Sequence, residues 1–416
     1  MLTLDKTKIF GHLIEKHVNE AAFLWLLRSQ AVVQPHHGPT YIRKLEQRIN
    51  NHLTGLSLNP EAAWEFAVEA ANFNESGEVF VLAMLALMSG NNEKINSAIE
   101  FASHDKETFK GLVSALGWAP DAYVNVMLRQ WIESNDVLHK HLAVVACSVR
   151  RMDPQLFLNH LFNDSQHVKN IPLMCRMLRL VGELKRHDLL HELKKAQRHN
   201  HKDVVFWAHW SALMLGDQSS LSGLETYVMA PGPFQSRAIS VVFRCLAQSQ
   251  SWEWINKLIK QPGQMANTII ALSVLGDPHG INWLLARMEE PVHAKISGYA
   301  FNMITGVDLA EKKLVLTQAP TDDDIEEDEI PVITGYENLP APDAKKVSEY
   351  WQQIRHAFVS GQRYFLGKSI NKNNVEQVMN QGAQGQRLAA ALEYALLDGT
   401  HAYPNLKSAL RFTGNK

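Results

Sequence analysis

The sequence is poor in the features that most readily identify a function. Among its 416 residues there are three cysteines, Cys147, Cys175 and Cys245, and there is no C-x-x-C pair. An odd number of widely spaced cysteines argues against a disulfide framework. It favours buried free thiols in a reducing compartment.

Long apolar runs are also scarce. The longest, Val79–Met88, is much shorter than the roughly 20 residues that a membrane-spanning helix needs. The N-terminal residues 1–17 carry charges where a signal peptide needs an apolar segment. We therefore expect a soluble cytoplasmic protein with no membrane contact.

Charge of one sign is not in excess. Lys and Arg number 41 against 43 Asp and Glu, which gives a formal net charge of −2. A dedicated nucleic-acid binder would be basic overall, so this balance argues against one and leaves only a local basic face open. Apolar residues make up 46% of the chain, which is enough for a large core and excludes a wholly disordered chain.

The sequence does contain a repeat. The stretch 273–285, SVLGDPHGINWLL, places Leu275 before a Gly-Asp break and places Ile281 and Leu284 three residues apart after it. Similar patterns start from anchor positions 89, 118, 152, 184, 215, 246 and 275, in steps of 29 to 34 residues. A step of about 30 residues corresponds to two helices of roughly 12 residues and two turns.

The residues at the breaks fit helix ends. Gly216 and Gly276 suit the position just after a helix, where a left-handed backbone is common. Asp217 and Asp277 can accept hydrogen bonds from the first N–H groups of the next helix. Pro278 then falls at the first helical position, where its missing N–H is not needed. In this stretch His279 and Asn282 are left to face a partner.

These patterns predict an all-α protein, an α-solenoid of helical hairpins in which stacked pairs share one core. The expected organisation is an N-terminal helical cap (1–76), an array of about seven repeats (77–317), an acidic and Pro-rich linker or loop (318–343) and a C-terminal helical region (344–416).

Residues 271–306, ALSVLGDPHGINWLLARMEEPVHAKISGYAFNMITG, resemble a HEAT-type repeat of the short bacterial kind. Eight segments together resemble an uncharacterised bacterial family of HEAT-repeat proteins, often encoded near type VI secretion spike and effector genes: 17–32, 46–56, 77–87, 111–118, 271–306, 339–351, 361–370 and 384–397. The resemblance implies a helical scaffold whose neighbouring genes encode secretion proteins. It implies no catalytic residues.

The stretch 184–202, LKRHDLLHELKKAQRHNHK, is the strongest surface signal. Several of its cations recur at spacings of three and four, so we expect them on one helix face. This face fits an acidic protein segment, a nucleic acid or the chain's own acidic run; Asp188 and Glu192 also fit an ordinary solvated surface. The candidate partner-binding residues are Lys185, Arg186, His187, His191, Lys194, Lys195, Arg198 and Lys202.

An acidic run is the second candidate surface. It lacks the Asp-x-Asp-x-Asp-Gly spacing of a calcium loop, and like charges keep such a run extended. We interpret it as a solvated linker or as a docking segment for a partner, rather than as a metal site. Its residues are Asp322, Asp323, Asp324, Glu326, Glu327, Asp328 and Glu329.

Two further patterns bear on enzymatic alternatives. Trp207, Trp210, Trp252 and Trp254 are either core residues or part of a base-cradling surface, as in HEAT proteins that excise alkylated DNA bases. The segment 361–369, GQRYFLGKS, has one residue too many for a phosphate-binding loop, and no strand is predicted before it.

The sequence therefore predicts a non-enzymatic helical-repeat scaffold or adaptor that binds a protein partner, with no catalytic residue, metal site or cofactor. The resemblance suggests a type VI secretion effector or spike component as that partner. The alternative is a nucleic-acid-binding HEAT protein of the alkyl-base DNA glycosylase kind.

Overall fold

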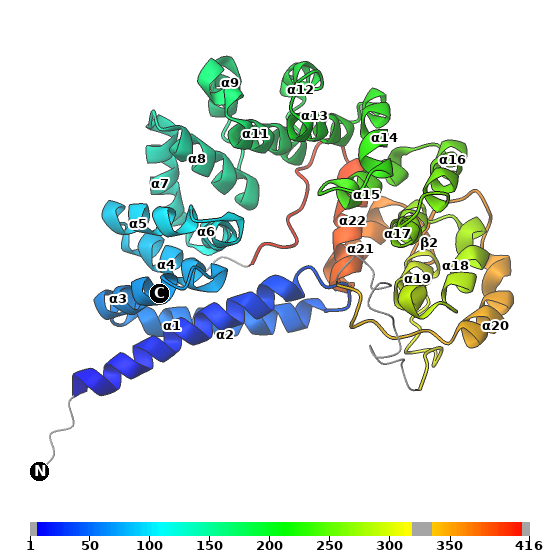
Figure 1. Cartoon of the computed structure of the whole chain (residues 1–416), viewed down its shortest axis with the longest axis horizontal. Helices are drawn as coiled ribbons and strands as arrows, with labels where there is room; N and C mark the ends of the chain where they lie inside the picture. The colour runs from blue at the N-terminus through cyan, green and yellow to red at the C-terminus, as the bar shows by residue number, and fades with distance from the viewer. Residues whose placement is uncertain (1–5, 318–334, 410–416) are drawn as a thin grey trace, which may run out of the picture. The chain divides into compact units, whose positions relative to one another are not determined.

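The computed structural model describes residues 6–317 and 335–409, with the side chains of residues 11–317 and 335–409. These residues form 22 α-helices, several 3-10 turns and one two-stranded hairpin, so the prediction of an all-α protein is confirmed (Figure 1). They divide into two compact units. Unit 1 comprises 6–33, 37–184 and 402–409, and unit 2 comprises 34–36, 185–317 and 335–401.

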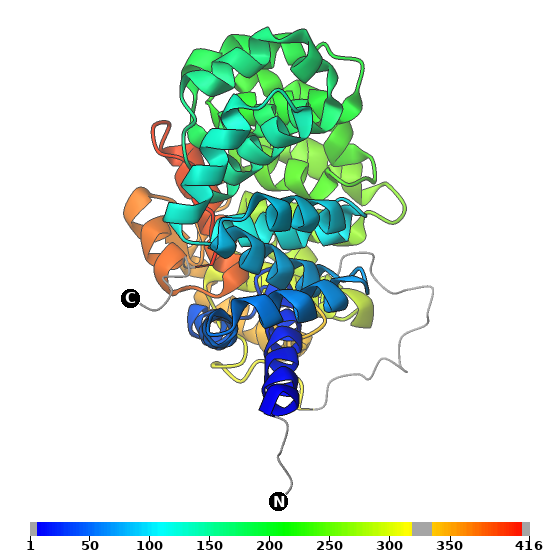
Figure 2. The same ribbon diagram turned by 90° about the vertical axis from the view of Figure 1, so that its left-hand side faces the viewer.

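Successive helices of unit 1 pack side by side in two layers (Figures 1 and 2). In layer A, α4 contacts α6, α6 contacts α8 and α8 contacts α11; α5, α7 and α10 pack against this layer. The helices are α1 (Lys6–Ala31), α2 (Pro39–Ser57), α3 (Pro60–Ala71), α4 (Ser76–Ser89), α5 (Asn92–Ala102), α6 (Lys106–Trp118), α7 (Asp121–Glu133), α8 (Val137–Arg150), α9 (Leu156–Asn163), α10 (Ser165–Lys169) and α11 (Ile171–Leu184).

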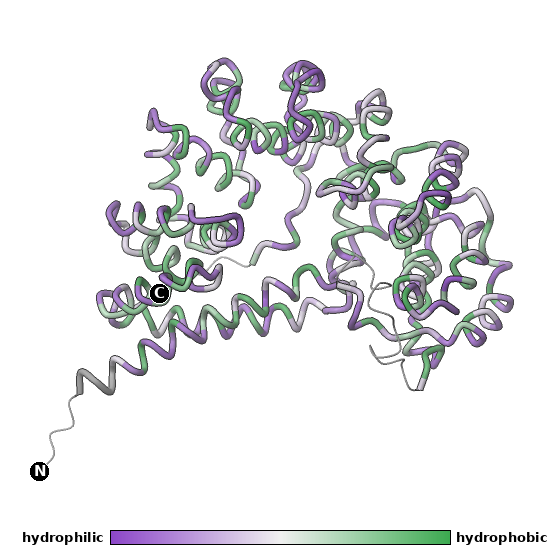
Figure 3. The backbone as a smooth tube through the Cα atoms, in the orientation of Figure 1, coloured by the Kyte–Doolittle hydropathy of each residue, from purple (hydrophilic) through white to green (hydrophobic). Residues whose placement is uncertain are grey.

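The longest apolar run of the sequence forms the centre of unit 1. Every residue from Val79 to Leu87 in α4 is buried, because α1, α3, α5 and α6 surround this helix. A helix that is apolar all round is stable in water only when it is covered on every side. By contrast, apolar and polar residues alternate along α1 and α2 (Figure 3); the exposed residues of α2 are largely polar, whereas α1 also exposes Leu13, Phe23 and Leu27.

Unit 2 repeats the two-layer arrangement. Its layer A contains α13, α15, α17 and α19; α15, α17 and α19 contact one another in turn, and α12, α14, α16 and α18 pack against the layer. The helices are α12 (Leu190–Ala196), α13 (Lys202–Met214), α14 (Leu221–Met229), α15 (Gln235–Cys245), α16 (Gln248–Ile259), α17 (Met265–Leu275), α18 (Ile281–Arg287), α19 (Pro291–Thr305), α20 (Ala344–Ile354), α21 (Lys372–Gln381) and α22 (Gln384–Leu397). The 3-10 turns are η1 (His187–Leu189), η2 (Gln218–Ser220), η3 (Pro278–Gly280) and η6 (Arg355–Ala357).

The seven predicted anchor positions all fall at the ends of layer A helices. Four are the last residue of α4, α6, α11 or α17, two directly follow α13 or α15, and one lies two residues beyond α8: Ser89, Trp118, Leu184, Leu275, Leu215, Leu246 and Met152. The sequence period therefore matches the helix boundaries in each unit. The boundary between the units, after Leu184, lies inside the array expected over 77–317.

The structure bears out most of the predicted chemistry at the breaks. Gly276 and Gly216 have left-handed φ angles of +70° and +90°. The Asp277 carboxylate accepts the N–H of His279 at 3.0 Å, and both His279 and Asn282 are exposed.

The N-cap prediction for Asp217 is wrong. Its carboxylate accepts no N–H from the turn that follows. It accepts instead the hydroxyls of Ser219 at 2.8 Å and Ser220 at 2.6 Å, together with the Lys194 ammonium. The two serines place hydroxyls where the backbone N–H groups would otherwise bind.

The segment 361–369 forms a hairpin rather than a phosphate-binding loop. Strands β1 (Tyr364–Phe365) and β2 (Lys368–Ser369) pair antiparallel around Leu366 and Gly367, whose φ angles are +50° and +75°. Two successive left-handed residues make the type I′ turn that suits a two-residue hairpin.

The predicted acidic run, 322–329, lies outside the described residues. On either side of the gap, Val315 and Pro342 form an isolated antiparallel bridge, and Leu316 N–H donates to Ala341 O at 3.0 Å. None of the described helices combines the length and the apolar character that crossing a bilayer requires.

Candidate functional site at the ends of the layer A helices

The C-terminal end of a helix exposes carbonyl groups without intrahelical partners and carries the negative end of the helix dipole. In both units, extended segments and cationic side chains meet these ends. We call residues 361–367 of unit 2 the strap and residues 402–409 of unit 1 the tail.

The tail crosses the ends of α11 and α8 in unit 1. The N–H of Tyr403 donates to the carbonyl of Glu183 at 2.7 Å. Arg151 Nε donates to the carbonyl of Tyr403 at 2.6 Å, and its guanidinium lies 5.6 Å from the centre of the Tyr403 ring. Two residues further on, Asn405 Nδ2 donates to Val149 O at 2.9 Å.

Arg151 is positioned by a buried carboxylate. Glu183 is fully buried and accepts Arg151 Nη1 at 3.1 Å, Arg179 Nε at 2.7 Å and the Ser148 hydroxyl at 2.6 Å. Burial alone would raise the pKa of Glu183, but the cations around it outweigh burial and lower that pKa. The carboxylate therefore stays ionised and holds the guanidinium beside the tail.

The neighbouring Arg150 serves the end of α6 in the same way. Its side chain is buried, and Nη1 donates to the carbonyls of Leu116 at 2.6 Å and Ala119 at 3.1 Å. Nη2 pairs with Asp121. The adjacent residues Arg150 and Arg151 thus bind different targets: Arg150 binds the end of α6, and Arg151 binds the tail.

The strap crosses the ends of α17 and α19 in unit 2. Tyr364 N–H donates to Gly276 O at 2.8 Å, and the hairpin turn donates two N–H groups to Met303 O at 2.7 Å and Ile304 O at 2.9 Å. The Asp277 carboxylate that caps η3 also accepts Gly361 N–H at 3.0 Å. A Cβ atom on Gly276 would lie 2.3 Å from Tyr364 O, so only glycine fits beneath the strap.

Arg363 binds the ends of two helices at once. Its guanidinium donates to the carbonyls of Arg244, at the end of α15, and of Val274 and Leu275, at the end of α17, over 3.1–3.3 Å. It also pairs at 2.7 Å with Glu393 of α22, which is 3% exposed and pairs with Arg244 Nε at 3.0 Å. These charges, of which the side chains of Arg244 and Glu393 are buried, fix the strap and α22 to the repeat helices of unit 2.

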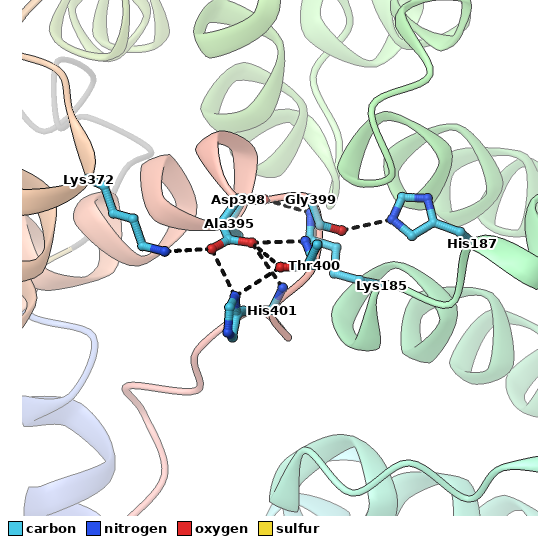
Figure 4. A network of polar contacts seen from close by, with 8 residues as sticks. All are labelled: Lys185, His187, Lys372, Ala395, Asp398, Gly399, Thr400 and His401. Carbon is cyan, nitrogen blue, oxygen red and sulfur yellow. Dashed lines mark hydrogen bonds and ion pairs between the residues drawn. The ribbon is translucent and has the colours of Figure 1, made fainter.

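A polar network surrounds the residues that follow α22 (Figure 4). Asp398 accepts Lys372 Nζ at 2.9 Å, the Thr400 N–H at 2.9 Å and hydroxyl at 2.6 Å, and His401 Nδ1 at 2.8 Å. The hydrogen bonds, led by that of Thr400, lower the pKa of Asp398. All of these bonds lie within unit 2. We call residues 398–401 the clasp.

Lys185 is not part of an exposed basic face. It is 6% exposed, and its ammonium donates to Met214 O at the end of α13 and to Ala395 O of α22, the latter at 2.6 Å (Figure 4). Burial lowers its pKa to about 8, although Asp398 partly opposes this shift. The side chain neutralises two helix ends.

The expected common face is also interrupted in its backbone. His187 lies in η1 and Arg198 lies beyond α12, so within this stretch only the exposed or half-exposed His191, Lys194 and Lys195 share the α12 helix. His187 Nε2 donates to Gly399 O at 2.8 Å, as part of the contacts around the clasp.

Neighbouring carboxylates neutralise most of the remaining cations. Arg186 pairs with Asp188 through two bonds of 2.8 Å, and Lys195 pairs with Glu192 at 2.9 Å. Two side chains, Arg198 and Lys202, are exposed and have no ion pair to a described residue. The stretch supplies a small cationic surface rather than a continuous basic face.

The tryptophans do not form an open cradle. Trp207, Trp210 and Trp254 are buried, and Trp252 is half-buried with its Nε1 donating to Asp277 at 2.9 Å. Their rings pack within unit 2 and so give no support to the base-excision alternative.

Sequence reasoning missed the charged residues at the helix ends. Arg151 and Glu183 directly precede anchors 152 and 184, and Arg244 lies two residues before anchor 246. A charged residue recurs in the last turn before an apolar anchor. This pattern could have predicted a side chain at the helix end, next to carbonyls without intrahelical partners. Arg363 and Glu393 lie outside the repeats and offered no comparable signal.

The arrangement binds polypeptide backbone. The described residues contain no group of three or more His, Cys, Asp or Glu side chains placed to hold a metal ion. Comparison with protein-family models, with curated proteins and with solved structures finds no match to this chain.

Proposed function

We propose that the protein is a non-enzymatic helical-repeat scaffold that binds a protein partner by accepting an extended segment across the ends of its layer A helices. One observation carries the proposal. In each unit a segment of the chain already crosses these ends, held in part by main-chain hydrogen bonds: from Tyr403 in the tail, and from Tyr364 and the hairpin turn Leu366–Gly367 in the strap.

Main-chain recognition suits a scaffold, because it fixes a segment's path without demanding one sequence. The carbonyls at the helix ends are fixed by their helices, so little order is lost when a segment binds. Stacked helices also supply a long surface without a deep pocket.

The resemblance to HEAT-repeat proteins encoded near type VI secretion genes suggests the partner, an effector or a spike component. A cytoplasmic site of action, in keeping with the cysteine content, is part of the same proposal.

The test is a binding measurement with the intact chain. Proteins captured on it from extracts of its own cells would be purified and titrated against it by calorimetry. We expect at least one to bind with a dissociation constant of about 10 μM or tighter. The proposal fails if no captured protein binds once purified, or if duplex DNA binds with steep salt dependence instead.

A matched pair of variants then locates the surface. Arg198→Glu/Lys202→Glu reverses the two exposed cations without an ion pair to a described residue, and Lys106→Glu/Lys260→Glu reverses two exposed cations elsewhere. If the helix ends bind the partner, both pairs retain affinity within about threefold. Selective loss in the first pair would move the partner site to the basic stretch.

A further inference from the structure

We infer that the tail is a built-in ligand: it occupies a peptide site on unit 1, and an extended partner segment that carries an aromatic residue two positions before an asparagine displaces it. This inference rests on the proposed function and names the partner's chemistry.

The contacts of the tail define what the site recognises. The Tyr403 N–H and carbonyl bind Glu183 O and Arg151 Nε, and these two bonds would form with almost any residue except proline. Two side chains of the tail add selectivity. The Tyr403 ring lies against the Arg151 guanidinium at 5.6 Å, and the Asn405 amide reaches Val149 O at 2.9 Å.

The site is organised by residues outside the tail. Glu183 and Ser148 hold Arg151 in place from α11 and α8. Glu183 O and Val149 O lie in the last turns of those helices, where helical geometry supplies no N–H partner. The acceptors and the guanidinium therefore keep their positions when the tail leaves, and another chain can use them.

The tail is held less firmly than the strap, which uses helix ends in a similar way. The strap contains the buried Phe365, is fixed by the Arg363–Glu393 pair and is followed by the packed helices α21 and α22. Every residue of the tail is half-buried or exposed. The strap therefore contributes a buried side chain to the core of unit 2, whereas no residue of the tail is buried.

The tail stays covalently joined to the chain after release, because residue 402 directly follows His401 of the clasp. Asp398 binds Lys372, Thr400 and His401, and His187 binds Gly399 O, all within unit 2. Release therefore needs no change in these bonds. A tethered ligand has an effective concentration of roughly millimolar, so a partner segment must compete with it and binds more tightly once the tail is weakened.

The test measures binding in trans with the full chain. The probe is a fluorescein-labelled peptide with the sequence of residues 400–409, THAYPNLKSA, followed by anisotropy. Tyr403→Pro removes the N–H that Glu183 O accepts and removes the ring on Arg151. We expect this variant to bind the peptide at least tenfold more tightly than the unmodified chain does.

A matched peptide pair tests the geometry. Methylation of the peptide nitrogen at its tyrosine removes one hydrogen bond and should weaken binding at least fivefold, whereas methylation at the last alanine should not. Asn405→Ala is the second protein variant; it keeps the backbone of the tail and should raise peptide affinity about threefold. Circular dichroism confirms that each variant is folded.

The inference is overturned if neither variant binds the peptide more tightly than the unmodified chain does, or if both methylated peptides bind alike. Its failure differs from that of the proposed function. If a purified partner binds but the peptide does not compete with it, the inference about the tail is refuted and the proposed function stands. Peptide binding as expected, with no protein partner, would sink the scaffold proposal alone.

Discussion

The two Leu-Gly-Asp breaks of unit 2 allow a controlled test of the strap. Gly276 and Gly216 both have left-handed φ angles, +70° and +90°. An added Cβ on Gly276 would lie 2.3 Å from Tyr364 O, whereas one on Gly216 would meet no atom within 4 Å. The two glycine-to-alanine substitutions therefore share the backbone strain and differ in the contact with the strap.

The shared part is small. Placing alanine in the left-handed region costs about 1–2 kcal/mol, so Gly216→Ala should lower the free energy of unfolding by that amount. In Gly276→Ala the strap must also move, since a main-chain carbonyl cannot swing aside as a flexible side chain would. Loss of the Tyr364–Gly276 bond and of neighbouring contacts adds about 1–3 kcal/mol, giving about 2–5 kcal/mol in total.

Hydrogen exchange by mass spectrometry measures this effect at the strap itself. The amides of Tyr364, Leu366 and Gly367 should exchange at least tenfold faster in Gly276→Ala than in Gly216→Ala, with urea unfolding giving the global difference. Equal exchange and equal destabilisation in the two variants would refute the argument that the strap depends on this glycine.

Three further predictions follow from charged residues in unit 2 and from the half-buried His141 of unit 1. Burial, aided by a nearby arginine, lowers the pKa of His141 to about 4. As the pH falls, this histidine is therefore protonated in the unfolded chain before it is protonated in the folded one. The free energy of unfolding of unit 1 should drop by about 2–3 kcal/mol between pH 6.5 and 4. His141→Phe should remove this part of the pH dependence of urea unfolding, and an unchanged slope would contradict the assignment. The lowered pKa of Lys185 leaves more of it as free amine at pH 7, but its Nζ is covered and donates to two carbonyls, so acetylation followed by mass spectrometry should modify the exposed Lys202 at least tenfold faster; faster reaction at Lys185 would contradict its burial. Arg363→Met and Glu393→Gln should each destabilise unit 2 by about 2–3 kcal/mol in urea, because the first leaves the buried Glu393 with one cation fewer and the second removes the carboxylate that Arg363 and Arg244 share; the double variant should cost less than the sum.

The helix layout could be predicted from sequence because it depends on local periodicity. Each anchor marks the end of a helix, and Gly276, Asp277 and Pro278 act within a few residues of one another. The exception, Asp217, differs because two serines that follow it compete for its carboxylate. That competition is local too, but it depends on side-chain rotamers that no pattern specifies.

The candidate site could not be predicted in the same way. Lys185 lies in a run of cations that looks exposed, and only the packing of α13 and α22 buries it. Arg363 reaches Arg244 across 119 positions of sequence, and Arg151 reaches Tyr403 across 252. Contacts of this length arise from topology, which one sequence does not reveal.

The assignment of the tail to unit 1 has a consequence for biosynthesis. Residues 402–409 leave the ribosome after all of residues 185–401, so unit 1 lacks its last segment while unit 2 is being made. At about 5–20 residues per second, that interval lasts roughly 10–40 s. During this time the ends of α8 and α11 stand uncovered on a nascent chain, and a partner made in the same cell can reach them before the tail does.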